Sequence, residues 1–270
     1  MLKQRLLTAL LLGSLFLGAL FYLPSLAWAL FLLVFIAIGA MEWGGLAGYS
    51  RTGRSIFVGL IVASALLLLA APQPEPLRMI SLTLLATSCL FWLLLAPFWL
   101  WRHWPVGAPW RSSLTGAVLL LPPWLALVQL HKTSTGAVLA AMAAVWLADS
   151  AAYFFGKRYG RNKLAPAISP GKTWEGVAGA VATVALATTA LCYWLGWNLW
   201  LVAGSVVIVM MSVVGDLFES LVKRQAGKKD SGNLLPGHGG VLDRIDGLTS
   251  TLPLVALATY FPQYFLLQPN

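Results

Sequence analysis

Charged residues are scarce in this chain of 270 residues. Asp, Glu, Lys and Arg together make up 10% of it, against 59% hydrophobic residues and a mean hydropathy of +0.79. A soluble domain carries about 25% charged residues, and one soluble core of this length could not hide so much apolar surface. The same composition excludes a disordered chain and a collagen-like repeat. A bilayer is the remaining solvent, so the sequence predicts an all-α, polytopic integral membrane protein.

Cysteine is also scarce, because Cys89 and Cys192 are the only two and each lies inside an apolar run. No CxxC pair or Cys/His cluster occurs, which excludes a disulfide framework and a zinc site. The sequence contains no HExxH, GxSxG or EF-hand pattern either. We therefore expect both cysteines to be buried packing residues, and the chemistry must come from other groups.

Long apolar runs are abundant. A membrane-spanning helix needs about 20 mainly apolar residues, and the sequence predicts about nine such helices. They lie near residues 6–23, 26–47, 56–71, 77–100, 113–130, 134–156, 174–195, 198–222 and 245–265. The fifth run contains Pro122 and Pro123, which should kink or split its helix.

The first apolar run has some features of a secretory signal peptide. Lys3 and Arg5 precede it, and residues 27–29 read Ala-Trp-Ala, which resembles a signal-peptidase site. The run is longer than a usual signal core, and another apolar run follows at once. We therefore expect a retained first helix.

Basic residues alternate in density from one loop to the next. The net charge is +9, and with nine spans 16 of the 18 Lys and Arg residues fall on the side that holds the N-terminus. The positive-inside rule makes that side cytoplasmic. We expect a protein of the bacterial-type inner membrane with its N-terminus inside and its C-terminus outside, and no nucleic-acid partner for its positive charge.

The acids are concentrated in the second half of the chain. Seven of the nine lie between residues 149 and 246. Asp149 and Asp216 stand inside apolar runs, where an ionised carboxylate is costly unless it is paired or hydrated. Their spacing from Lys157 and Lys223 puts both roughly 10–12 Å below the cytoplasmic surface. We expect one shared polar pocket open to the cytoplasm, the alternative being that each acid pairs separately with a nearby base.

Asp243 and Asp246 are spaced i, i+3 at the start of the last apolar run. Carboxylates that converge from two or three helix ends form a hard oxygen site, which suits Mg²⁺ shared with substrate phosphates. Favourable interaction with the helix dipole is the alternative for this pair. That alternative does not account for Asp149 and Asp216.

Two loops, 157–173 and 223–244, combine basic residues with Gly, Ser and Pro. Glycine lets backbone N–H groups approach an anion closely, while Lys and Arg neutralise its charge. Topology alone would not require the five glycines at 227, 232, 237, 239 and 240. We therefore expect these loops to bind phosphates.

The stretch from Ser220 to Asp246 resembles the signature of the phosphatidate cytidylyltransferase (CDP-diacylglycerol synthase) family. The matching positions are Ser220, Lys223, Arg224, Lys229, Asp230, Gly232, His238, Gly239, Gly240, Asp243, Arg244 and Asp246. A preceding block is also similar, through Asp149, Tyr153, Gly156, Lys163, Ser169, Pro170, Lys172, Thr173, Glu175 and Gly176. Gly171 departs from the family, which we expect often to carry a basic residue there.

The resemblance implies transfer of a cytidylyl group from CTP to phosphatidate, with release of pyrophosphate and a requirement for Mg²⁺; a second cation and a homodimer stay open. It divides the chain into N-terminal transmembrane scaffold helices, residues 1–133, and a C-terminal transmembrane catalytic region, residues 134–270. Asp216, Asp243 and Asp246 would bind metal, and the further catalytic residues would be Asp149, Lys223 and His238. The substrate-binding set would be Lys163, Ser169, Lys172, Thr173, Ser220, Arg224, Lys229, Gly239, Gly240 and Arg244.

Two other functions remain as alternatives. An ion-coupled transporter also carries paired intramembrane acids, but near the bilayer middle and within an internal repeat, and no clear repeat is present. A related lipid kinase or cytidylyltransferase that uses CTP on another lipid would share the phosphate-binding loops. The unbroken signature from Ser220 to Asp246 argues against it.

Overall fold

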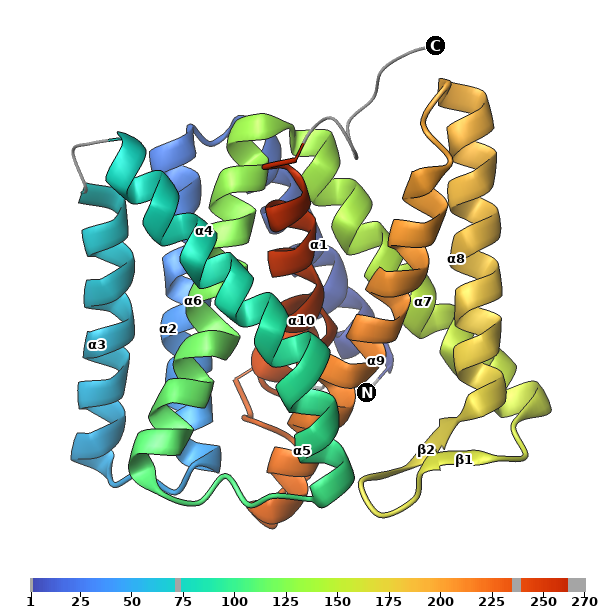
Figure 1. Ribbon diagram of the computed structural model, residues 1–270. Coiled ribbons are helices and arrows are strands. Elements are labelled where there is room, and N and C mark those ends of the chain that lie inside the picture. Colours follow the sequence, from blue (N-terminus) through green and yellow to red (C-terminus); the bar gives the residue numbers. More distant parts are fainter. Residues whose placement is uncertain (1, 71–73, 235–238, 262–270) are drawn as a thin grey trace.

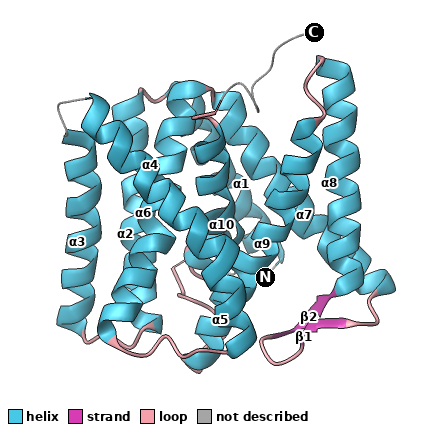
Figure 2. Cartoon of the chain, in the orientation of Figure 1, coloured by secondary structure: helices cyan, strands magenta, loops and turns pink. Residues whose placement is uncertain are grey.

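The protein is a bundle of helices with one small β-hairpin at one end (Figures 1 and 2). The computed structural model describes residues 2–70, 74–234 and 239–261. The helices are α1 (Leu2–Tyr22), α2 (Ser25–Leu46), α3 (Arg51–Ala70), α4 (Pro74–Leu90), α5 (Ala96–Arg102), α6 (Pro109–Thr133), α7 (Thr135–Tyr159), α8 (Trp174–Leu195), α9 (Trp200–Gln225) and α10 (Leu242–Ala258). The predicted all-α class is confirmed.

Every predicted apolar run coincides with a helical segment. Within the described ranges, seven segments are long and apolar enough to cross a membrane: Ser25–Leu46, Arg51–Ala70, Leu77–Arg102, Pro109–Thr133, Thr135–Tyr159, Trp174–Leu195 and Trp200–Gln225. The third of these joins α4 to α5 through one π-helical segment, Phe91–Leu95. The apolar part of α1 (Leu10–Tyr22) and α10 are shorter, so the predicted count of nine is approximate.

The proline pair does not split its helix. Pro122 and Pro123 both lie inside α6, which continues from Pro109 to Thr133. Both prolines are buried, and so are Leu119, Leu120 and Trp124 beside them. A membrane helix tolerates proline where neighbouring helices pack around the altered turn. Tertiary packing thus overrides the local signal for a break.

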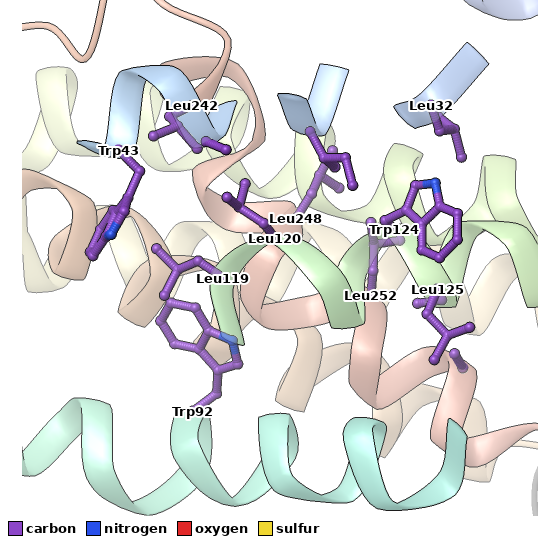
Figure 3. Close-up of a cluster of buried hydrophobic side chains, with 14 of the residues drawn as sticks. Leu32, Trp43, Trp92, Leu119, Leu120, Trp124, Leu125, Leu242, Leu248 and Leu252 are labelled. Carbon is purple, nitrogen blue, oxygen red and sulfur yellow. The ribbon is translucent and has the colours of Figure 1, made fainter. Parts of the chain in front are cut away.

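Helix α10 lies at the centre of the bundle and connects its two halves. It packs against α9 and α7 on one side and against α6, α4 and α2 on the other. Figure 3 shows the contact, in which Leu242, Leu248 and Leu252 of α10 lie among large side chains of the first half. Trp43 and Trp124 in this cluster are almost completely buried. The last helix of the predicted catalytic region is therefore held by the predicted scaffold.

The segment expected as a plain loop between α7 and α8 contains a β-hairpin. Strand β1 (Lys163–Ala165) runs antiparallel to β2 (Ser169–Thr173), with Lys163 opposite Thr173 and Ala165 opposite Ser169. Its Lys, Gly and Pro content gives little β-propensity, so the sequence did not indicate strands. The hairpin lies at the end of the bundle where α5, α7 and α9 also end (Figure 1).

Candidate active site

Charged side chains from α9, α10 and the hairpin meet at this end of the bundle. Lys172 of β2 places its Nζ 2.5 Å from Oδ2 of Asp216 in α9. The other oxygen of Asp216 accepts a hydrogen bond from Ser220 one turn later, at 3.2 Å. Asp149 of α7 lies within electrostatic range of both Asp216 and Asp246. The acids expected to share one pocket are therefore brought together.

A second ion-pair group lies one to two turns further along α9. The ammonium of Lys223 is 2.6 Å from Oδ1 of Asp243 and 3.4 Å from Oε1 of Glu219. The exposed fractions of the three side chains are 10%, 6% and 4%, respectively. Charges this far from water must be paired, because an unpaired one is strongly destabilising. Lys223 thus neutralises two carboxylates that come from different helices.

Asp243 also anchors the loop that precedes α10. Its Oδ2 accepts hydrogen bonds from the backbone N–H of Ser231 at 2.9 Å and from that of Gly240 at 2.9 Å. The hydroxyl of Ser231 lies 3.0 Å from the same oxygen. With Lys223 at Oδ1, both oxygens of Asp243 are engaged by protein donors, so this side chain organises the loop and the lysine together.

Two glycines of this loop have no room for a side chain. Gly239 has φ +81°, and a Cβ there would lie 2.8 Å from Oδ2 of Asp243. A Cβ on Gly240 would lie 2.6 Å from both carboxylate oxygens of Glu42. Glycine is the residue for a positive φ and for a close approach of backbone to another group. The glycines therefore let the loop close tightly over the acids; His238 falls outside the described residues.

Close packing of α7 against α8 positions the hairpin. A Cβ on Gly176 would lie 2.7 Å from the carbonyl oxygen of Ala152 in α7. Thr173, which is buried, accepts a hydrogen bond from the N–H of Gly176 at 3.2 Å and so caps α8. Glu175 accepts hydrogen bonds from Asn162 just before β1, the shortest at 2.7 Å. These contacts fix the base of the hairpin and hence the position of Lys172 against Asp216.

The remaining predicted phosphate-binding residues lie around this centre. The guanidinium of Arg224 donates to the carbonyl of Ile168 at 3.4 Å and to that of Lys228 at 3.3 Å, so it links the end of α9 to the hairpin turn. Ser169 is half-buried beside that turn. The exposed members of the set are Lys163, Lys229 and Arg244. Both predicted cytoplasmic loops therefore contribute basic groups to one end of the bundle.

Three polar residues at the site had no predicted role. Glu42 of α2 accepts hydrogen bonds from the N–H groups of Val241 and Leu242, and Ser231 lies between Glu42 and Asp243. Glu219 completes the Lys223 group. Glu42 could have been noticed because it is the only acid in the first 74 residues. Its partners lie about 200 residues away, and no sequence spacing predicts that contact.

The acids were tested for their fit to a divalent cation by their chemistry. In the part of the chain that the structure describes, no three Asp, Glu, His or Cys side chains come together as a complete set of metal ligands. Mg²⁺ usually binds one or two carboxylates and takes its other oxygens from water and substrate phosphates. Asp216 and Asp246 fit that pattern, since Asp246 accepts only the N–H of Gly247 among the described contacts, at 2.7 Å. Asp243 fits less well, because protein donors occupy both of its oxygens.

The fold and this site together define a polytopic membrane protein with a phosphate-binding type of site at one end of its helices. Its sequence identifies the kind of chemistry. The chain belongs to the cytidylyltransferase family, whose family model matches residues 3–261.

Characterised relatives cover the whole length of the chain. A phosphatidate cytidylyltransferase of Pseudomonas aeruginosa is 42% identical over 266 residues, which is 95% of this chain and 96% of the relative. The protein of the same name from Brucella suis is 37% identical over 95% of this chain and 92% of its own length. A third, from Haemophilus influenzae, is 46% identical over 124 residues, 43% of each chain. The resemblance expected from the signature is confirmed.

Proposed function

We propose that this protein is an enzyme of phospholipid biosynthesis that transfers the cytidylyl group of CTP to phosphatidate, giving CDP-diacylglycerol and pyrophosphate. One observation carries the proposal: the Lys172–Asp216 and Lys223–Asp243 pairs lie at the same end of a membrane bundle. The family model and the names of the relatives support this reaction. The site has the charges that two phosphate-bearing substrates require.

The site faces the cytoplasm of a bacterial-type inner membrane, with the N-terminus inside and the C-terminus outside. This orientation is supported by the excess of Lys and Arg in the loops on the side of the site. CTP is a water-soluble polyanion, whereas phosphatidate is held in the bilayer. A site at the cytoplasmic interface is accessible to both.

In the reaction, a phosphate oxygen of phosphatidate attacks the α-phosphorus of CTP. The new P–O bond forms as the bond from the α-phosphorus to the oxygen that bridges to the β-phosphorus breaks, and pyrophosphate leaves. The attacking phosphate is already anionic at neutral pH, so no activated Ser or Cys is needed. The main barrier to offset is repulsion between two anions.

The basic residues of the two loops offset this repulsion. Lys172 and Arg224 approach from the hairpin and the end of α9, and the exposed Lys229 and Arg244 extend the positive surface. Lys223 is committed to Glu219 and Asp243, so it acts mainly by holding the loop before α10 in place. Backbone N–H groups near Gly239 and Gly240 provide further donors for a phosphate.

Asp216 and Asp246, with Asp149 nearby, would hold Mg²⁺ in the loaded enzyme, and a second cation remains open. The ion would neutralise charge on the phosphates of CTP and on the departing pyrophosphate. The carboxylates orient the triphosphate indirectly, and Lys172 keeps Asp216 in place through its ion pair.

The experiment is an assay of purified protein with CTP labelled at the α-phosphate, phosphatidate and a Mg²⁺ titration. Label should move into the lipid fraction, and Asp216→Asn and Asp246→Asn should each abolish that transfer. Competition between phosphatidate and other phosphorylated lipids separates this function from a related CTP-dependent lipid enzyme. Ion flux without nucleotide turnover would support a transporter instead.

A further inference from the structure

Glu42, near the end of α2, is hydrogen-bonded to the start of α10 and to the loop before it. Its Oε1 accepts the N–H of Val241 at 3.0 Å, and its Oε2 accepts that of Leu242 at 2.9 Å. Both donor residues are almost fully buried, at 3% and 2% exposed. Val241, the N-cap of α10, has no side chain that could accept these bonds. Glu42 therefore supplies from another helix the anionic cap that α10 lacks.

Glu42 is also coupled to the site through one hydroxyl. Oγ of Ser231 lies 3.0 Å from Oε2 of Glu42 and 3.0 Å from Oδ2 of Asp243, and it donates its single proton to one of them at a time. Ser231 is 6% exposed, and its own N–H is bound to Asp243 at 2.9 Å. A chain of contacts therefore runs from Glu42 through Ser231 and Asp243 to Lys223.

The backbone is built closely around this carboxylate. Side chains at Gly232 and Gly240 would both collide with Glu42, the latter at 2.6 Å from each oxygen. Two further contacts come from the same end of α2: Leu242 packs over Gly39, and the ammonium of Lys228 donates to the carbonyl of Gly45 at 3.1 Å. Positions 39, 42 and 45 are three residues apart and lie on one side of the helix.

We propose that Glu42 is a positioning residue of the active site, through which the first half of the chain sets the conformation of the loop 231–242. It holds the amino end of α10 and Ser231 in register, so that Asp243 keeps Lys223 in place and Asp246 enters the site from the first turns of α10. The first helices are thus part of the site's construction as well as of the bundle. The effect on catalysis rests on the proposed function, whereas the effect on the loop does not.

The test compares wild type with Glu42→Gln, which keeps the side chain's size but removes its charge and one acceptor oxygen. Glu75→Gln is the matched control, because Glu75 is exposed and its ion pair with Arg78, at 3.8 Å, lies outside the site. Hydrogen exchange by mass spectrometry on the full chain in nanodiscs is the readout that does not depend on activity. We expect at least a tenfold increase in exchange for the peptide covering 239–246 in Glu42→Gln, with α7 and α9 unchanged.

For cytidylyl transfer we expect kcat to fall by about 10–100-fold, the range for residues that orient a primary ligand. The KM for CTP should change less than threefold, since Glu42 contacts no predicted phosphate-binding side chain. Glu75→Gln should resemble wild type in both measurements. Ser231→Ala removes only the hydroxyl link, so it should lower kcat in the same direction while its loop exchanges less than that of Glu42→Gln.

Unchanged exchange at 239–246 in Glu42→Gln would overturn the proposal, and so would loss of protection across all helices, which would indicate a global structural role. A wild-type kcat with a loosened loop would also overturn it. If Glu42→Gln does not fold, a wild-type kcat in Ser231→Ala would contradict the link from Glu42 to Asp243. Absence of any transfer by wild-type protein would instead overturn the proposed function, while the exchange arm would still test the positioning.

Discussion

Lys223 and Asp243 form a buried ion pair, with 2.6 Å between Nζ and Oδ1 and 10% and 6% of the two side chains exposed. They lie on α9 and at the start of α10, 20 residues apart, with the whole signature loop between them. The pair closes that loop at its two ends. The following predictions concern the pair, the glycines around it and the more exposed pair beside it.

Replacing Lys223 by Met should destabilise the protein strongly. The substitution leaves Glu219 and Asp243 buried without a counter-charge, and breaking a buried pair in this way costs about 3–5 kcal/mol. Thermal unfolding in a fixed detergent should show a clear drop in Tm. Lys229→Met is the control, since Lys229 is exposed and its loss should leave Tm nearly unchanged. Equal Tm values for the two variants would contradict the burial argument.

Lys172→Met should behave in the opposite way, with a small effect on stability and a large one on activity. The side chains of Lys172 and Asp216 are 23% and 31% exposed, and an ion pair this accessible is screened by water, so its loss should cost no more than about 1 kcal/mol. Loss of one charged donor at a phosphoryl centre should lower kcat by about 10²–10³-fold. Near-normal turnover with CTP and phosphatidate would exclude Lys172 from the site.

Gly239→Ala should abolish or greatly reduce activity while the helices remain folded. The new methyl group would meet Asp243 at 2.8 Å in a backbone conformation with φ +81° that alanine rarely adopts. Gly171→Ala is the matched control, since Gly171 belongs to the hairpin and has open space around its Cβ position. Helix content by circular dichroism should be the same for both variants, with turnover lost only in the first.

Gly176→Ala should act through the packing of α7 against α8. Its methyl group would lie 2.7 Å from the carbonyl of Ala152, which forces the two helices apart at the base of the hairpin. Overpacking of this kind typically costs 1–3 kcal/mol, that is, about that range in the free energy of unfolding. We expect a lower Tm and a weakened effect of Lys172. Gly204→Ala, with nothing within 4 Å of its Cβ, should leave both Tm and turnover unchanged.

The fold was largely predictable from the sequence because the bilayer imposes simple constraints. Each apolar run had to become a helix, since the hydrocarbon core offers no other partner for backbone N–H and C=O groups. Helix boundaries were less accurate: α3 begins at Arg51 and α10 at Leu242, several residues before the expected starts. Arg51 and Asp243 are charged, so the apolar pattern alone excluded these first turns.

The site was predictable where residues lie on one helix or at equal depth, as for Asp149 and Asp216. The parts that were missed depend on contacts between distant segments. The hairpin β1–β2 is built from residues of low strand propensity and is held by Asn162–Glu175 and Thr173 contacts. Glu42 reaches Leu242 across 200 positions of the sequence. Such contacts follow from how α2 packs against α10, which no local pattern encodes.

The central claim is that the Asp216–Lys172 end of the bundle transfers a cytidylyl group from CTP to a membrane lipid. The most direct measurement uses purified protein in nanodiscs containing phosphatidate, with CTP labelled at the α-phosphate, and compares wild type with Asp216→Asn. The account predicts one labelled CDP-lipid formed per pyrophosphate released by wild type, and loss of both products in Asp216→Asn while its Tm stays near that of wild type. Labelled lipid formed at the wild-type rate by Asp216→Asn would contradict it.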